Sequence, residues 1–301
     1  MIILFLLALS LSTPAPSALL KNTSNLSTQF QEKCFGLVPT ESVNRAALSS
    51  LLCGKNITDS SLKENLIKTS IIHIFVISGS HLILLDELLS LLRVPLFFRF
   101  LFLGCYSLAT GWQPPAVRAL LALIVKTYFR CWHWNFSSDQ LVMITGLVSL
   151  ALFPEWWNSF SLVMSWCAAL AFSCVTLLRV RGKLMALVIA QLAVFLFMSA
   201  PLWGLGSLHP LGLLYNLTLA PLVAFLLLPL AFLTMMIHPL SVIFDGAFSL
   251  FSAVLQMAAE PIPSMSQNTP SLSFLWIWIF TWQVFIHFFR LHLHQGKDHP
   301  R

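Results

Sequence analysis

Long apolar runs that carry almost no charge are the feature that most limits how this chain can fold. Of its 301 residues, 57% are hydrophobic and only 9% are charged. A soluble domain usually has about 25% charged residues, so the composition excludes a soluble enzyme, a disordered chain and a fibrous repeat. Runs of about 20 apolar residues suit helices that cross a ~30 Å hydrocarbon core, whereas a β-barrel needs alternating segments of about 10 residues. The sequence therefore predicts an all-α polytopic membrane protein.

The composition divides the chain into four parts. Residues 1–20 are apolar and then rich in small side chains, which fits a signal peptide or a first transmembrane helix. Residues 21–70 form a polar segment that we expect to be exported, and residues 71–290 form a transmembrane bundle. Residues 291–301 form a basic tail, expected in the cytoplasm.

Nine spans are predicted within the bundle, which gives about nine to ten transmembrane helices if the N-terminus also crosses. They are Ile71–Leu92, Leu96–Gly111, Ala116–Phe129, Leu141–Phe153, Phe160–Leu178, Leu184–Leu202, Leu211–Ile237, Ser241–Ala258 and Leu272–Phe289. Pro221 and Pro229 are expected to bend the longest of these spans, because proline removes a helix hydrogen bond.

Two short amphipathic helices are predicted in the exported segment. The first covers Ser42–Leu52 and is ended by Gly54, and the second begins at Asp59 as its N-cap. Glu64 and Lys68 have the i,i+4 spacing of a favourable ion pair on the second helix. We expect both helices to lie on a membrane surface or on the outer face of the bundle.

The positions of the lysines and arginines predict the orientation of the spans. If residues 21–70 are outside, ten of the 17 basic residues are inside, six are in the exported segment and one, Arg118, is within a span. The short outside connections carry no Lys or Arg. This pattern is typical of a multi-pass membrane protein.

Ionisable residues within spans are candidates for function, because each is costly in lipid unless it is paired or hydrated. His73 and His81 are eight residues apart, and Ser78 and Gly79 lie between them. This small polar patch would allow close helix packing or an opening that exposes carbonyls. Packing of small residues with hydrogen-bonded core histidines explains the same pattern. Arg118 requires water, an anion or a partner from another helix.

The six cysteines differ in their surroundings. Cys34 and Cys53 are the two in the exported segment, where a disulfide is plausible in an oxidising compartment. The other four lie in or beside spans and are expected to act as small hydrophobic residues. The histidine-rich tail lacks the spacing of a zinc site, so we expect no metal, no cofactor and no catalytic residue.

Three stretches resemble conserved blocks of the ComEC competence family of inner-membrane DNA-uptake channels. The first block resembles the segment from Ala47 to His81, which ends in Ile-Ser78-Gly79-Ser80-His81. The second, of the form "TG…P..RA", resembles Thr110-Gly111-Trp-Gln-Pro-Pro-Ala-Val-Arg118-Ala119, and a weaker third resembles Asn216 through Pro221. The resemblance covers roughly Val43 to Met236. Here Ser80 replaces the usual Leu, and Ser70 replaces the usual Gly.

The resemblance implies a channel that carries single-stranded DNA across the cytoplasmic membrane during natural transformation. It places His73, Ser78, Gly79, His81, Gly111 and Arg118 along the DNA path. Implied partners are single-stranded DNA, membrane lipids, a DNA receptor and a cytoplasmic translocase, and a homo-oligomer is left open. The nuclease-type and OB-type domains of many family members do not fit in this sequence. Their activities are therefore not carried over.

Two alternatives agree with the same residues. One is a polytopic transporter or intramembrane enzyme for a small anionic or lipid substrate, with Arg118 on the anion and the histidines relaying protons. The other is a non-conducting relative that serves as an assembly scaffold. A measurement of DNA uptake into the cytoplasm distinguishes both alternatives from a channel, because only a channel itself carries the DNA.

Overall fold

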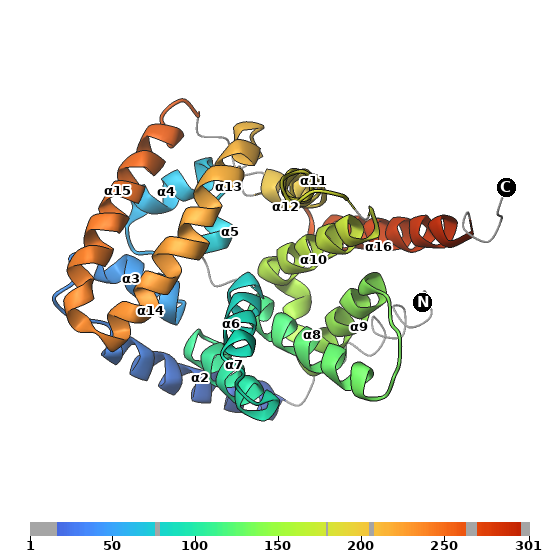
Figure 1. Cartoon of the computed structure of the whole chain (residues 1–301), viewed down its shortest axis with the longest axis horizontal. Helices are drawn as coiled ribbons and strands as arrows, with labels where there is room; N and C mark the ends of the chain where they lie inside the picture. Colours follow the sequence, from blue (N-terminus) through green and yellow to red (C-terminus); the bar gives the residue numbers. More distant parts are fainter. Residues whose placement is uncertain (1–16, 76–78, 179, 205–207, 263–269, 296–301) are drawn as a thin grey trace. The chain divides into compact units, whose positions relative to one another are not determined.

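A computed structural model of the chain consists of helices joined by short non-helical connections in its described part (Figure 1). The described residues are 17–75, 79–178, 180–204, 208–262 and 270–295. These ranges contain no strand, which confirms the all-α class. The contacts divide the chain into two units. Unit A comprises Pro16–Leu120 and Leu205–Gln267, and unit B includes Leu121–Gly204 and Asn268–Arg301.

Unit A is built from the N-terminal helices and a later helical hairpin. Its helices are α2 (Ser17–Leu37), α3 (Arg45–Cys53), α4 (Ser60–Lys68), α5 (Ile72–Phe75), α6 (Gly79–Leu91), α7 (Leu96–Ala109), the first turns of α8 (Pro114–Cys131), α13 (Leu211–Leu222), a π-helical segment η2 (Val223–Leu227), α14 (Leu228–Met236), η3 (His238–Leu240) and α15 (Ser241–Ala259). The π-helical segment lies between Pro221 and Pro229, where the sequence predicts a bend.

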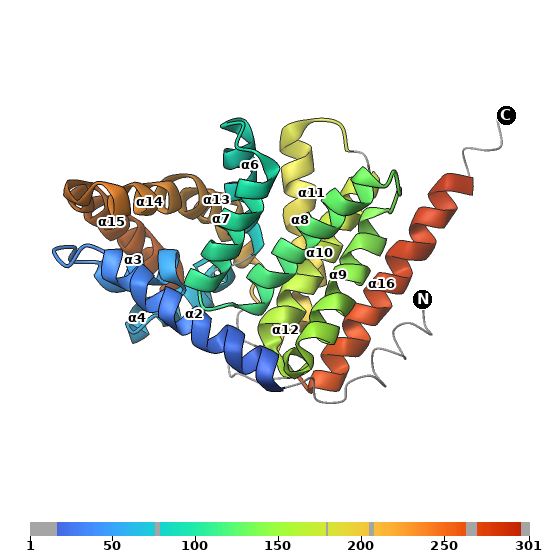
Figure 2. The same ribbon diagram turned by 90° about the horizontal axis from the view of Figure 1, so that it is seen from below.

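Unit B is a bundle in which α9, α10 and α16 pack side by side (Figure 2). Its elements are the rest of α8, α9 (Ser138–Leu152), η1 (Pro154–Asn158), α10 (Phe160–Leu178), α11 (Lys183–Phe197), α12 (Ser199–Gly204) and α16 (Leu272–Gln295). The indole N–H of Trp276 donates to the Trp157 carbonyl at 3.0 Å, which ties the start of α16 to the end of η1.

Four helices in the described ranges are long and apolar enough to cross a membrane. They are Phe160–Leu178, Leu211–Met236, His238–Ala259 and Leu272–Leu293. Three further apolar helices, α7, α9 and α11, are shorter. The prediction of nine to ten spans is therefore not confirmed. The predicted span Ile71–Leu92 comprises α5 and α6, with residues 76–78 outside the described part, and Leu184–Leu202 comprises α11 and α12.

The polar segment 21–70 contains the two short helices that the sequence predicts. Gly54 ends α3 with a left-handed φ of 65°. Asp59 caps α4, because its carboxylate accepts hydrogen bonds from the Ser61 hydroxyl and the Leu62 N–H. The same two bonds lower the pKa of Asp59. Glu64 and Lys68 pair at 2.9 Å. The long helix α2 is not among the predicted elements.

Helix α3 is buried in the core of unit A and does not lie on a surface. Its residues Ala47 to Cys53 are all buried. Leu48, Leu51 and Leu52 belong to the same hydrophobic cluster as Leu227 of η2 and Phe248 of α15. Segment 21–70 therefore shares one core with two of the candidate spans.

Asp245 of α15 fastens the N-terminal end of α3. Its carboxylate accepts hydrogen bonds from the Ser42 hydroxyl at 2.7 Å and from the backbone N–H groups of Val43 and Asn44 at 3.0 Å. These N–H groups precede a helix whose N-cap Asn44 makes no side-chain cap of its own. We call this set of contacts the Asp245 clasp.

The Asp245 clasp limits the topology of unit A. Asp245 lies four residues after Ser241, where α15 begins, and this is about 6 Å along a helix axis. A bilayer core is ~30 Å thick. The loop Ser42–Asn44 and the His238–Leu240 turn therefore lie at the same level.

This shared level can be tested by labelling from one side of the membrane. Val43 is 89% exposed and His238 is also exposed. We expect Val43→Cys and His238→Cys to react with a membrane-impermeant maleimide added to the same side of intact cells. Labelling of the two positions from opposite sides would contradict the contact. The unsubstituted chain measures the background from Cys131, the one exposed native cysteine among the described residues.

Candidate functional site

Gly79 brings the first motif into contact with the second. It begins α6, and a methyl group added there would lie 3.0 Å from the Ala119 Cβ and 3.3 Å from the Pro115 carbonyl oxygen of α8. A methyl group at these distances would require a neighbouring atom to shift by a few tenths of an ångström, so the hydrogen of glycine suits the position. The two sequence blocks, about 35 residues apart, therefore pack on each other at the start of α6 and α8.

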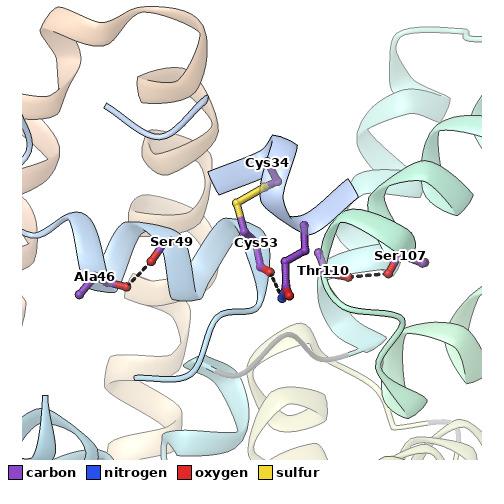
Figure 3. Close-up of a disulfide and its surroundings, with 7 residues drawn as sticks. Cys34, Ala46, Ser49, Cys53, Ser107 and Thr110 are labelled. Carbon is purple, nitrogen blue, oxygen red and sulfur yellow. Dashed lines mark hydrogen bonds between the residues drawn. A yellow bond between two sulfur atoms is a disulfide. The ribbon is translucent and has the colours of Figure 1, made fainter. Parts of the chain in front are cut away.

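Gly111 brings the second motif against the disulfide-linked helices. It ends α7 with a φ of +88°, and Trp112 follows with a φ of 51°, so two left-handed residues turn the chain into α8. A methyl group at Gly111 would lie 3.1 Å from Gln31 Nε2, which donates to the Cys53 carbonyl at 2.8 Å. Figure 3 shows the Cys34–Cys53 disulfide near Ser107 of α7 and Thr110, the first residue of the motif.

Ser70 joins the first motif to the third. It is fully buried and has a left-handed φ of 61°, which glycine adopts without strain. A methyl group on Gly212 of α13 would lie 2.7 Å from the Ser70 Oγ. Asn216 donates to the Gly212 carbonyl at 2.8 Å, so the third motif begins at this contact.

Two ionisable side chains lie buried beside these contacts. His81 is 2% exposed and Arg118 is 7% exposed. Arg118 directly precedes Ala119, which faces Gly79, and His81 is two residues after Gly79. His73 on α5 is half-buried, and Ser78 lies outside the described residues. The buried hydroxyls of Thr69, Ser107 and Thr110 donate to nearby helix carbonyls, so they need no ligand.

Asp86 and Arg99 form an ion pair between α6 and α7. The Nε and Nη2 atoms of Arg99 lie 3.0 and 2.6 Å from the Asp86 Oδ1. Asp86 lies near the end of the predicted span Ile71–Leu92, where an unpaired carboxylate would have to reach the membrane surface. For Asp86 the structure provides an internal partner instead, and the pair holds the α6–α7 hairpin together.

A second charged cluster lies in unit B and was missed by the sequence analysis. Asp139 at the start of α9 faces Arg290 and His287 of α16. The sequence pattern that places Asp139 in the first turn of a helix is Ser137-Ser-Asp139-Gln140, a capping box ahead of an apolar run. The predicted span begins at Leu141, two residues after Asp139, and so leaves Asp139 outside the helix. In the parts that the structure describes, no group of His, Cys, Asp and Glu is arranged to hold a metal ion.

Comparison with known proteins identifies the family. The sequence matches the family described as Competence protein over residues 51–294. The chain belongs to the Competence protein family. This range contains Gly79, Gly111 and Arg118 and most of both units. Membership, together with the apolar helices, makes the chain a membrane protein.

One curated relative matches part of the chain. The uncharacterized protein MG316 of Mycoplasma genitalium is 25% identical over 173 residues, which is 56% of this chain and 46% of that protein. The matching part therefore spans less than half of the relative's length. No solved structure matches the chain.

The contact between Gly79 and Ala119 can be tested with compensating substitutions. Gly79→Ala is expected to destabilise the protein by about 1–3 kcal/mol, because the added methyl overpacks the α6–α8 contact. Ala119→Gly removes the opposing methyl, so the double variant is expected to be more stable than the sum of the two changes by about 1 kcal/mol. The measurement is thermal unfolding of the detergent-purified protein. Strict additivity would show that these two motif residues do not touch.

The contact between Ser70 and Gly212 allows a second cycle of this kind. Gly212→Ala places a methyl against a buried serine and is expected to cost about 1–3 kcal/mol. Ser70→Gly removes both serine atoms that the methyl would meet and suits the left-handed φ. The double variant is therefore expected to regain most of the lost stability. Equal losses in Gly212→Ala with and without Ser70→Gly would contradict the predicted contact.

Proposed function

We propose that this chain forms a channel that passes single-stranded DNA inward across the cytoplasmic membrane during natural transformation. The observation that carries the proposal is the match to the Competence family over residues 51–294, a range that includes both motif glycines and Arg118. In this proposal the chain spans the inner membrane several times and performs no chemistry of its own. Other proteins supply the energy and degrade the second strand.

The chemistry of a DNA strand explains why the path needs these residues. Every nucleotide brings a phosphate charge, so a membrane path for DNA needs polar and preferably cationic lining groups. Arg118 supplies a permanent charge, because guanidinium stays protonated and matches the geometry of a phosphate. The proposed path contains His73, Ser78, Gly79, His81, Gly111 and Arg118.

The burial of His81 and Arg118 implies that the proposed path is closed in this conformation. At 2% and 7% exposure neither side chain can meet a phosphate unless neighbouring helices move apart. The contact of Gly79 with α8 lies next to both residues. We therefore place the opening movement at the α6–α8 contact, where the first two motifs meet.

The outer side of the proposed channel supplies a weak attraction for DNA. Segment 21–70 holds six Lys or Arg residues against four acidic ones, and long-range attraction between charges steers association. A DNA receptor outside and a translocase inside are the proposed partners.

The central test is the substitution Arg118→Ala. We expect the variant to lower uptake of labelled DNA to the level of a strain that lacks the gene, while expression and membrane insertion stay normal. DNA bound outside the membrane is measured separately from DNA in the cytoplasm, because loss of the channel lowers only the second. Lys126→Ala is a matched control, because Lys126 is an exposed cation on the same helix.

A further variant separates the charge of Arg118 from its packing. Arg118→Lys keeps the charge and is expected to retain part of the uptake. Normal transformation with Arg118→Ala would overturn the role of this residue. A strain without the gene that still internalises DNA but has altered lipids or small-molecule uptake would instead support the alternative transporter.

A further inference from the structure

A buried ionic cluster joins the N-terminal end of α9 to the C-terminal end of α16. The side chain of Asp139 is fully buried, at 0% exposure. Its Oδ1 atom lies 3.5 Å from the Arg290 Nε, and its Oδ2 atom lies 3.5 Å from the His287 Nδ1. Gln283, one turn before His287, donates from Nε2 to the Asp139 backbone carbonyl at 2.9 Å. We call Asp139, His287 and Arg290 the α9–α16 cluster.

The positions of these residues on their helices explain the signs of the charges. A helix carries partial positive charge at its N-terminal end and partial negative charge at its C-terminal end. Asp139 lies in the first turn of α9, and Arg290 lies in the last turns of α16. The two helices run antiparallel, since Trp276 and Trp157 meet at their other ends. Both helix dipoles therefore favour the ionised forms.

The hydrogen bonding of the cluster is incomplete within the described ranges. Both carboxylate oxygens of Asp139, the Nε of Arg290 and the Oε1 of Gln283 are buried without a hydrogen-bond partner. Contacts of 3.5 Å provide ionic attraction but are too long for good hydrogen bonds. Unpaired acceptors outnumber unpaired donors by three to one. One additional proton in the cluster would therefore supply a hydrogen-bond donor for an acceptor that now lacks one.

The contact between Arg290 and His287 shows which atom of the cluster can accept the additional proton. The Nη2 of Arg290 lies 3.0 Å from the His287 Nδ1. Guanidinium is a donor only, so Nδ1 accepts this bond with its lone pair and carries no hydrogen. The Nδ1 atom therefore cannot donate to Asp139 Oδ2 in this state. The bond from Arg290 therefore requires the His287 tautomer with its hydrogen on Nε2.

We propose that the α9–α16 cluster is a proton-binding site. One proton from water binds to His287 Nδ1, which forms a single new N–H bond. The Arg290 Nη2–H bond to Nδ1 then breaks, the new Nδ1–H donates to Asp139 Oδ2, and the guanidinium moves onto Asp139 Oδ1. The net charge of the cluster rises from zero to +1. The hydrogen bonds between α9 and α16 thus change partners with one protonation.

The surroundings leave His287 as the basic group of the cluster that water can reach. Its side chain is 21% exposed, so a proton from water can reach it, whereas Asp139 is enclosed. Helix α10, which packs against both α9 and α16, contains no Asp, Glu, His, Lys or Arg in its described range, and its titratable side chains are Cys167 and Cys174. Ser173 and Thr176 of α10 contact Ser138, next to Asp139. Asp139 is the one acidic or basic residue of α9.

The proposal is tested by infrared difference spectroscopy of the purified full chain between about pH 5 and pH 8, the range in which histidine titrates. In the unsubstituted chain we expect a carboxylate band that shifts in step with one imidazole protonation. Asp139→Asn identifies the band by removing it. His287→Gln should abolish the shift, because glutamine still accepts a bond from Arg290 but binds no proton.

His292→Gln is the matched control, since His292 lies on the same helix and is exposed. This variant should lose an imidazole signal and keep the carboxylate shift. A shift that persists in His287→Gln, or no shift in the unsubstituted chain, would overturn the proposal. Circular dichroism and thermal unfolding of each variant verify that it is folded, so a misfolded protein is not mistaken for a lost site.

A link between this site and DNA passage rests on the proposed function and is tested separately. Uptake by the unsubstituted chain and by His292→Gln should vary with pH, and uptake by His287→Gln should not. An identical pH profile in His287→Gln would overturn the link while the channel stands. DNA uptake that persists in a strain without the gene would overturn the channel and leave the spectroscopic result unchanged.

Discussion

The structure depends on one constraint, which is that a charge buried in an apolar chain needs a partner from another segment. Three carboxylates meet this need in the same way. Asp86 pairs with Arg99 across a hairpin, and Asp139 faces His287 and Arg290 from the far end of the sequence. Asp245 receives the loop before α3, about 200 residues away. Because an unpaired buried charge costs several kcal/mol, each pair fixes which segments become neighbours.

Close packing at small residues acts together with these pairs. The absence of a side chain at Gly79 lets α8 pack closely, and the same absence at Gly212 lets Ser70 pack closely. Gly111 provides a left-handed turn beside Gln31. In lipid, where hydrophobic attraction between helices is weak, close approach at small residues contributes strongly to association. The motif residues that resemble a competence channel are thus also the residues that hold unit A together. Sequence resemblance alone cannot separate a role in the DNA path from a role in packing. The compensating variants at Gly79 with Ala119 and at Gly212 with Ser70 measure the packing role directly.

Local features of the fold could be predicted from the sequence, whereas tertiary partners could not. Asp59 and Gly54 mark helix ends through backbone chemistry that acts over three or four residues, and both predictions are confirmed. The number of spans is not confirmed, because hydropathy does not reveal where an apolar run divides into shorter helices. Helix α2 is rich in Ser, Thr and Asn, which are weak helix formers, so its sequence gave no clear signal. The partner of Asp139 depends on an approach between distant helices that no local pattern encodes.

The distribution of these restraints suggests which part of unit A can move. Helix α3 is fixed at its N-terminal end by the Asp245 clasp and at its C-terminal end by the Cys34–Cys53 disulfide. Helix α6 meets α8 through the glycine contact at its start and is joined by an ion pair to α7. A movement of the α6–α7 hairpin away from α8 would keep that ion pair and the α3–α15 contacts, but α7 would have to slide along α2, which packs on it and whose Ser27 hydroxyl donates to the Leu108 carbonyl at 3.0 Å. It would expose His81 and Arg118, which are the two buried ionisable groups of the proposed DNA path.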